Sequence, residues 1–283
     1  MQKLKIVECP RDAMQGIGKF IPTEKKVAYL NKLLSLGFDT LDFGSFVSPR
    51  AVPQMRDTAA VVPQLAAGST ATALLAIVAN QRGAEEAVKF DKIRYVGYPM
   101  SVSETFQLKN TNKTIARSLE ELARISALCQ QHQKGLVVYI SMGFGNPYGD
   151  PYTPETVAQF ADGLITLGAN VISLADTVGL ATAKEVHALF STVKQAGDDI
   201  AWGVHLHATP AMAREKIAAA IEAGCYRLDG AILGYGGCPM AGNHLVGNIN
   251  TRDILAVAAA KGFSTGIDPQ AFAEAEAMAA AIF

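Results

Sequence analysis

The chain has 283 residues, 49% of them hydrophobic, which is long enough to bury a large core, and we expect a single domain over residues 1–283. Lysine and arginine number 25 against 26 acidic residues, without a run of like charge, which argues against a nucleic-acid or anionic-membrane partner. Because no apolar stretch is long enough to span a bilayer and Met1–Ile6 lacks a signal core, we expect no membrane association and a cytoplasmic location.

Short β-branched or apolar runs alternate with longer helical patterns about eight times, which predicts parallel strands joined by crossover helices. No glycine-rich phosphate loop follows the first run, so we prefer an α/β fold of the TIM (β/α)8 barrel type to an open doubly wound sheet. The strands are predicted near Leu4–Glu8, Thr40–Phe43, Leu74–Val78, Ile93–Gly97, Leu136–Ser141, Val171–Leu174, Ala201–His205 and Arg227–Leu233.

The helices carry matching end signals. Thr153-Pro154 and Thr209-Pro210 each place a capping hydroxyl before a first-turn proline. Glycines follow five helical runs where a left-handed C-terminal cap is expected: Gly37, Gly168, Gly197, Gly224 and Gly262. The Ala-rich tail from Asp268 predicts an extra C-terminal helix, which either packs on its own barrel or meets another subunit in a homodimer or higher homo-oligomer.

Polar residues recur where the predicted strands end. In a TIM barrel the active site lies at the C-terminal ends of the strands, so residues placed there are functional candidates. The candidates at these ends are Arg11, Asp12, Asp42, Asp176, His205, His207 and Cys238. We therefore expect the chemistry at one mouth of the barrel.

His205 and His207 carry the clearest single signal. Residues i and i+2 of a strand project to the same face, so the two imidazoles are placed to share one metal ion. Two neutral imidazoles rarely complete a coordination shell, and Asp12 and Asn248 are the candidate oxygen ligands. A polar barrel interior is the alternative for the histidines, and a helix N-cap is the alternative for Asp12.

Arg11 is compatible with a structural ion pair or with a clamp on a substrate carbonyl. The four cysteines have no CxxC spacing, which argues against a disulfide framework or a structural zinc site. Cys238 follows two glycines and precedes a proline, a loop position where a thiol packs poorly. The other three, Cys9, Cys129 and Cys225, sit in apolar sequence and are interpreted as packing residues.

Together these motifs resemble 3-hydroxy-3-methylglutaryl-CoA lyase and its relatives among the metal-dependent barrel lyases, from about residue 3 to about residue 262. The most specific pieces are Pro10-Arg11-Asp12, the run 45–55 (SFVSPRAVPQM), the run 101–106 (SVSETF) with Asn110 and Asn112, the run 173–179 (SLADTVG), and Gly236-Gly237-Cys238-Pro239. The resemblance implies a TIM barrel that cleaves a 3-hydroxy-3-methylglutaryl thioester to acetoacetate and acetyl-CoA, as in leucine catabolism.

The resemblance also implies roles for residues. Mg²⁺ or Mn²⁺ would be held by Asp12, His205, His207 and Asn248, and an acyl-CoA would be the small-molecule partner. His205 is the candidate base for the substrate hydroxyl, Arg11 would stabilise the enolate oxygen, and Cys238 would take part in protonating the carbon. Asp42 and Asp176 would complete the acid–base and supporting network.

Among several departures from the family pattern, three bear most on the site. Asp42 replaces a usual Glu, Ala208 replaces the acid that follows the histidine pair and so removes an outer partner, and Arg252 replaces a usual Glu. These changes keep two alternatives open. One is a related aldolase or Claisen-type enzyme that acts on another hydroxy acid or its thioester. The other is a non-catalytic barrel that binds only a metal or an acyl-CoA.

Overall fold

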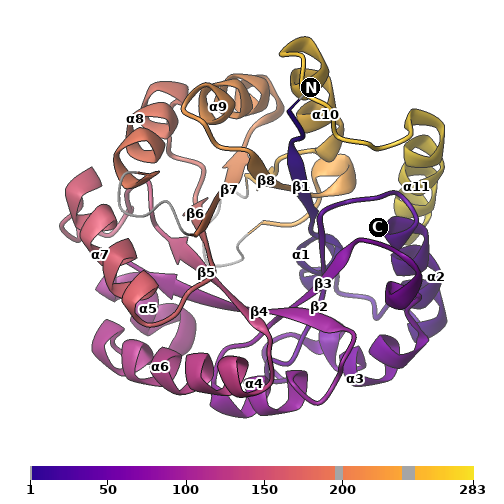
Figure 1. Cartoon of the computed structure of the whole chain (residues 1–283), viewed down its shortest axis with the longest axis horizontal. Helices are drawn as coiled ribbons and strands as arrows, with labels where there is room; N and C mark the ends of the chain where they lie inside the picture. Colours follow the sequence, from indigo (N-terminus) through magenta and orange to yellow (C-terminus); the bar gives the residue numbers. More distant parts are fainter. Residues whose placement is uncertain (1, 195–199, 238–245) are drawn as a thin grey trace.

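The computed structural model describes residues 2–194, 200–237 and 246–283. Eight parallel strands pair in chain order, and β1 pairs with β8 to close the sheet into a barrel (Figure 1). They are β1 Lys5–Glu8, β2 Thr40–Ser45, β3 Ala73–Ile77, β4 Ile93–Ser101, β5 Gly135–Ser141, β6 Val171–Asp176, β7 Ala201–Ala208 and β8 Arg227–Gly230. A further two-residue strand, β9 Gly247–Asn248, pairs antiparallel with β7. The predicted TIM barrel is confirmed.

Helices form a ring outside the strands (Figure 1). They are α1 Pro10–Gln15, α2 Thr23–Leu34, α3 Thr58–Val61, α4 Gln81–Ala87, α5 Glu104–Thr111, α6 Ile115–Gln131, α7 Pro154–Thr166, α8 Ala183–Val193, α9 Pro210–Glu222, α10 Thr251–Ala260 and α11 Pro269–Ile282. Each crossover returns the chain to the same end of the barrel, so the C-terminal ends of the eight strands share one mouth.

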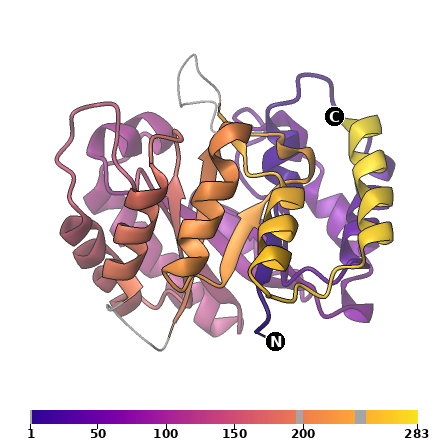
Figure 2. The same ribbon diagram turned by 90° about the horizontal axis from the view of Figure 1, so that it is seen from above.

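The predicted extra helix is α11, and it packs beside α2 on the outside of the barrel (Figure 2). Lys32 of α2 forms an ion pair with Glu274 at 2.6 Å, and the rings of Tyr29 and Phe283 pack edge to face with centroids 5.8 Å apart. The small residues Ala275 and Ala279 are buried on its inner face. The C-terminal helix therefore joins the end of the chain to the first large helix.

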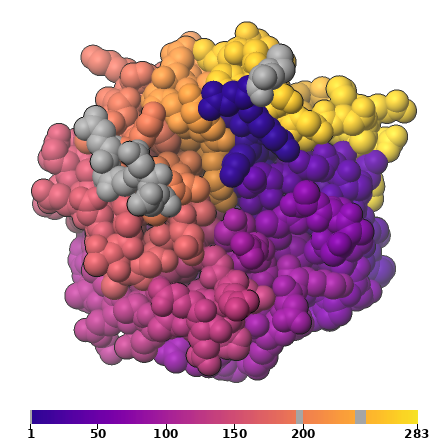
Figure 3. Space-filling model, in the orientation of Figure 1, coloured from indigo at the N-terminus to yellow at the C-terminus, as the bar shows by residue number. Residues whose placement is uncertain are grey.

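The core has two parts. The larger lies between strands and helices, and a smaller cluster of Leu75, Ile77, Val137, Tyr139 and Val171 fills the inside of the barrel. On the face that carries the N-terminus, early, middle and late segments of the chain meet around the centre (Figure 3). Apolar side chains therefore fill part of the barrel interior, and polar side chains follow toward the C-terminal ends of β7 and β8.

Most local predictions hold. Gly37, Gly168, Gly224 and Gly262 all have φ between 76° and 93°, the left-handed conformation expected of helix caps, and Gly197 lies outside the described residues. Thr153 caps α7 through its hydroxyl, whereas Thr209 stands at the N-cap of α9 without a side-chain cap bond.

The last strand ends earlier than predicted. β8 stops at Gly230, because the Ile232 amide donates a 2.7 Å hydrogen bond to Oε1 of Glu8 and Leu233 adopts a φ of 64°. In the part of the chain that the structure describes, no helix has the length and apolar character needed to cross a membrane.

Candidate metal centre and active site

Four predicted ligands converge at the C-terminal mouth. Asp12 lies in the first turn of α1, directly after β1, and His205 and His207 lie on β7, with Asn248 on β9. Ligand atoms of Asp12, His205 and His207 all lie within 4.8 Å of one another. Asp12, His207 and Asn248 are buried, and the side chain of His205 is 12% exposed. The strand alternation that predicted a shared face for the histidines is therefore confirmed.

Asn248 is positioned by backbone pairing. It is the register partner of His207 in the antiparallel β7–β9 ladder. Its Nδ2 donates to Oδ2 of Asp12 at 2.5 Å and to the carbonyl of Tyr235 at 2.9 Å. Gly236, with a φ of 93°, makes room for this amide, because a Cβ there would lie 2.6 Å from Nδ2 of Asn248.

These bonds leave two acceptors facing each other. Nδ1 of His207 lies 3.0 Å from the carbonyl oxygen of Thr177, which can only accept, so Nδ1 carries the proton and Nε2 carries a lone pair in the neutral ring. Nε2 lies 3.1 Å from Oδ1 of Asn248, whose amide nitrogen is already committed to Asp12. Burial and the nearby His205 lower the pKa of His207, which disfavours a second proton. Two lone pairs at this distance repel each other unless a cation lies between them.

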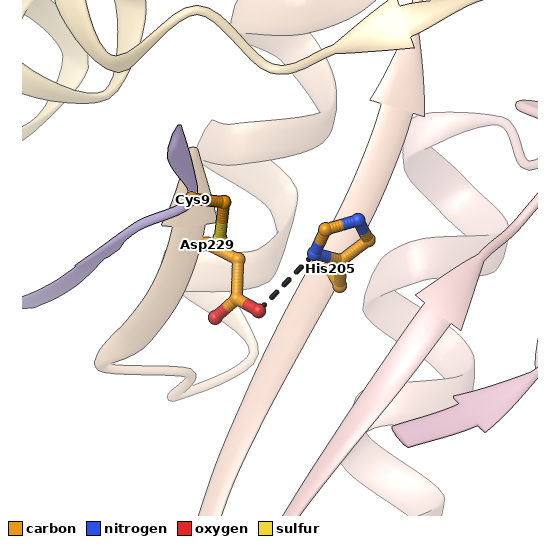
Figure 4. A group of neighbouring side chains, drawn as sticks. All are labelled: Cys9, His205 and Asp229. Carbon is orange, nitrogen blue, oxygen red and sulfur yellow. Dashed lines mark hydrogen bonds and ion pairs between the residues drawn. The ribbon is translucent and has the colours of Figure 1, made fainter. Parts of the chain in front are cut away.

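His205 is held from the other side by Asp229. Its Nδ1 donates to Oδ2 of Asp229 at 3.1 Å (Figure 4). Nη1 of Arg227 lies 3.4 Å from Oδ1 of the same carboxylate. The Tyr139 ring packs edge-on against the imidazole, with centroids 5.9 Å apart. Burial opposes the charged imidazole, but the bond to Asp229 and its charge raise the pKa of His205 above its ordinary value. Nε2 is thereby turned away from Asp229.

Arg11 links Asp12 to Asp42. Its Nε and Nη2 reach Oδ2 of Asp42 at 3.0 and 2.6 Å, while Nη1 reaches Oδ1 of Asp12 at 3.0 Å and Oε1 of Gln15 at 2.9 Å. Burial raises the pKa of Asp42 to about 6 despite this pairing. Burial also opposes ionisation of Asp12, but Arg11 and the two imidazoles lower its pKa below the ordinary value.

Asp176 is bound to a buried lysine. Nζ of Lys216, from α9, lies 2.7 Å from Oδ2 of Asp176, and both side chains are at most 2% exposed. The same ammonium donates to the carbonyls of His207 at 3.0 Å and Gly179 at 3.2 Å. Asp176 is therefore linked to the backbone of His207 through Lys216, and its predicted role in the supporting network stays a prediction.

Two interpretations of this site need revision. Cys9 is buried, as expected of a packing residue, but its surroundings are not purely apolar: its thiol lies in one group with His205 and Asp229 (Figure 4), because closure of the barrel places β1 beside β8. Ala208 was expected to leave an imidazole without an outer partner, but Asp229 and the Thr177 carbonyl hold the two rings.

Two more sequence positions need comment. Arg252 points toward the last helix rather than the ligands, since it forms an ion pair with Glu276 of α11 and is 58% exposed. Cys238 lies outside the described residues, so its predicted role stays a prediction.

Sequence reasoning missed Asp229, Lys216 and Gln15. Gln15 donates to Oδ1 of Asp12 at 2.5 Å, one helical turn along α1. A usable signal existed for Asp229, because Arg227 and Asp229 are charged residues at alternate positions of a predicted strand and so share one face. Lys216 gave no local signal, since a single lysine on an amphipathic helix is normally solvated.

Comparisons with known proteins identify the family of this chain. A family model described as HMGL-like matches residues 3–279. The chain is 32% identical over 275 residues to the hydroxymethylglutaryl-CoA lyase of Pseudomonas mevalonii, which covers 97% of this chain and 90% of that protein. It is 33% identical over 278 residues to the (R)-citramalyl-CoA lyase of Chloroflexus aurantiacus, with 95% and 87% covered. A solved HMG-CoA lyase from Acinetobacter baumannii, in complex with coenzyme A and 3-methylmalate, superimposes with a TM-score of 0.91 at 29% identity, with 99% and 91% covered.

Proposed function

Because this chain belongs to the HMGL-like family of carbon–carbon lyases, we propose that it cleaves 3-hydroxy-3-methylglutaryl-CoA to acetoacetate and acetyl-CoA with Mg²⁺ or Mn²⁺. The relatives support the reaction class, and the residues at the mouth of the barrel support the metal. The single observation that carries the proposal is the opposed pair of acceptors, Nε2 of His207 and Oδ1 of Asn248, at 3.1 Å beside Asp12.

The donor set fits a hard divalent cation. Asp12 and Asn248 offer oxygen, His205 and His207 offer imidazole nitrogen, and the ligand atoms of the three titratable residues already lie within 4.8 Å. A mixed oxygen and imidazole set suits Mg²⁺ or Mn²⁺ better than a tetrahedral thiolate site would. When bound here, a divalent cation supplies Lewis-acid polarisation of the substrate's hydroxyl oxygen.

The protein groups around it supply the proton and charge chemistry. The Arg11 guanidinium, at the edge of the ligand group, is placed to stabilise the negative charge that develops on the thioester oxygen as the carbon–carbon bond breaks. The resemblance implies His205 as the base for the hydroxyl proton; its Nδ1 already donates to Asp229, so Nε2 can take that proton only while it is not bound to the cation. Asp42, with a pKa of about 6, is a second carboxylate able to take up that proton near neutral pH. Cys238 stays the predicted donor of a proton to carbon.

A second substrate is supported by a specific comparison. The (R)-citramalyl-CoA lyase relative is as similar as the hydroxymethylglutaryl-CoA lyases, and citramalyl-CoA has a carboxylate where the other substrate has a carboxymethyl group. Asp42 is one methylene shorter than the usual Glu, and both its oxygens face Arg11. The same retro-Claisen cleavage of citramalyl-CoA yields pyruvate in place of acetoacetate. Other hydroxyacyl thioesters, and a non-catalytic barrel, stay as weaker alternatives.

The deciding experiment offers both thioesters to the metal-free enzyme with Mg²⁺, Mn²⁺ or EDTA, and measures acetoacetate, pyruvate and acetyl-CoA. We expect metal-dependent acetoacetate, abolished in His207→Ala and in Cys238→Ala. Pyruvate from citramalyl-CoA alone would transfer the assignment to that substrate. Absence of any product with Mn²⁺ bound would refute a lyase acting on either thioester.

The remaining predictions follow from the family. The structure from Acinetobacter baumannii holds coenzyme A, which supports an acyl-CoA as the partner of this chain. A cytoplasmic location, a role in leucine catabolism, a homo-oligomeric state and a single lyase domain over 1–283 stay predictions.

A further inference from the structure

A second group of potential ligands shares His205 with the proposed metal centre. Cys9 follows β1, Asp229 lies on β8 and His205 on β7, and one ligand atom from each lies within 4.8 Å of the other two. Figure 4 shows the thiol and the carboxylate on the same side of the imidazole. Asp229 is the register partner of His205, whereas Asn248 is the partner of His207 two residues further along β7. The two groups therefore lie one layer apart along the barrel.

The spacing of this second group fits a small tetrahedral cation. Ligand atoms bound at roughly 2.0–2.3 Å in a tetrahedron lie about 3.3–3.7 Å from one another. Nδ1 of His205 and Oδ2 of Asp229 are already 3.1 Å apart. The thiol of Cys9 is held only weakly within the described part of the chain, by a 3.7 Å contact to the carbonyl of Val7, so it can turn toward them. A movement of about 1 Å would complete the three-ligand set.

The chemistry of the group differs from that of Asp12, His207 and Asn248. It contains sulfur, which hard ions such as Mg²⁺ avoid and Zn²⁺, Co²⁺ or Cd²⁺ prefer. Cys9 and Asp229 are 1% and 3% exposed, so a bound ion would be shielded from water. Arg227 lies beside Oδ1 of Asp229 and leaves Oδ2 for a ligand role. A thiolate and a carboxylate together balance the two charges of such a cation.

We propose that Cys9, His205 and Asp229 form a binding site for a thiophilic divalent cation, and that its occupation displaces the cation held by Asp12, His205 and His207. The second half rests on the proposed function. On binding, the Cys9 thiol releases its proton to solvent and the sulfur binds as a thiolate. Nδ1 of His205 loses its proton as it binds the ion, and Nε2, on the partly exposed side of the ring, takes up a proton from solvent. Nε2 then carries a hydrogen and can no longer bind the cation held by Asp12 and His207.

The direct test uses Co²⁺ with the metal-free full-length protein, because a cobalt–thiolate bond produces a charge-transfer band in the near ultraviolet. We expect the band in the wild type, in Cys129→Ser, whose thiol is buried in the outer core, and in Cys238→Ser. It should be absent in Cys9→Ser, with Cys9→Ala as a second variant should the first fold poorly by circular dichroism. A band of undiminished strength in a folded Cys9 variant would overturn the proposal.

Displacement is tested with Mn²⁺, whose bound fraction is measured by electron paramagnetic resonance during a Zn²⁺ titration. We expect the Zn²⁺ concentration that releases half of the Mn²⁺ to rise at least about tenfold in Cys9→Ser, since a sulfur ligand to zinc is lost. If wild type and variant release half of their Mn²⁺ at the same Zn²⁺ concentration, Zn²⁺ binds at Asp12, His205 and His207 instead, and the proposed displacement is refuted. If the wild type binds no Mn²⁺, the proposed metal centre fails, while the cobalt band still decides the site at Cys9.

Discussion

Nδ1 of His205 donates to Oδ2 of Asp229 at 3.1 Å, with the carboxylate fully buried and paired with Arg227. This bond selects the tautomer in which Nε2 is unprotonated and faces the other ligands. If His205 binds the cation as we propose, Asp229 is a positioning residue for it.

We expect Asp229→Asn to lower Mn²⁺ affinity by about 10–100-fold, the usual cost of removing an outer partner of a metal-binding imidazole. Isothermal titration calorimetry measures the effect directly. Asp39→Asn, the same change beside Lys5 at the opposite end of the barrel, is the matched control and should bind Mn²⁺ as the wild type does. Unchanged affinity in Asp229→Asn would remove Asp229 from the metal centre.

The ionisation of Asp42 should be visible in the pH dependence of turnover. Burial raises its pKa to about 6, and a proton acceptor must be ionised, so kcat/KM is expected to rise with pH up to about 6 and level off above it. Asp42→Asn should lose this acidic limb together with most of the activity. If the residual activity of Asp42→Asn kept the same limb, another group would be the titrating acid.

Lys216 and Asp176 should behave as a buried pair. Lys216→Met leaves the Asp176 carboxylate without its cation, which we expect to cost about 3–5 kcal/mol in the free energy of unfolding. The double variant Lys216→Met/Asp176→Asn should recover part of this loss, as measured by urea denaturation. A kcat that collapses in Asp176→Asn with stability intact would show that Asp176 touches the reacting atoms instead.

Glu8 should make stability fall with rising pH. Burial, partly offset by bonds from Thr251 and Ile232, raises its pKa to about 8 from 4.5, so the folded protein holds a proton that the unfolded chain has lost between these values. Its stabilisation is complete below about pH 4.5 and is lost as the pH rises through about 8, with a slope of up to ~1.4 kcal/mol per pH unit. Glu8→Gln should flatten that slope in urea titrations, and an equal slope in both proteins would assign it to other groups.

Arg252 should affect stability rather than catalysis, through its contact with α11. Its guanidinium pairs with Glu276, so Arg252→Glu brings two carboxylates together and should lower stability by up to about 1 kcal/mol. We expect kcat to stay unchanged, because the side chain points toward α11. Glu276→Gln serves as the control that removes the pair without repulsion. A large loss of kcat in Arg252→Glu would return this position to the active site.

Local sequence patterns predicted the barrel well. Alternating apolar runs and helical patterns are set by which face of each element is buried, and helix caps depend on a few neighbouring residues, so both are visible in the chain itself. The end of β8 was misplaced because a side chain from β1 determines it: Glu8 binds the amide of Ile232.

Only the part of the site that depends on residues close in sequence could be predicted. His205 and His207 are two apart on one strand, so their shared face follows from the sequence alone. Cys9 was misinterpreted because its flanking residues are uninformative and its true neighbours, Asp229 and His205, arrive only when β8 closes the barrel against β1. Asn248 was proposed as a ligand, but its antiparallel pairing with His207 has no local signal in the sequence.

The β7–β9 ladder has an evolutionary consequence. Because main-chain pairing with His207 fixes Asn248, the ligand keeps its place whatever the length of chain that precedes residue 246. We expect insertions and deletions there to leave Asn248 beside His207. A chain built on this ladder can then vary in length before residue 246 while Asn248 stays in register with His207.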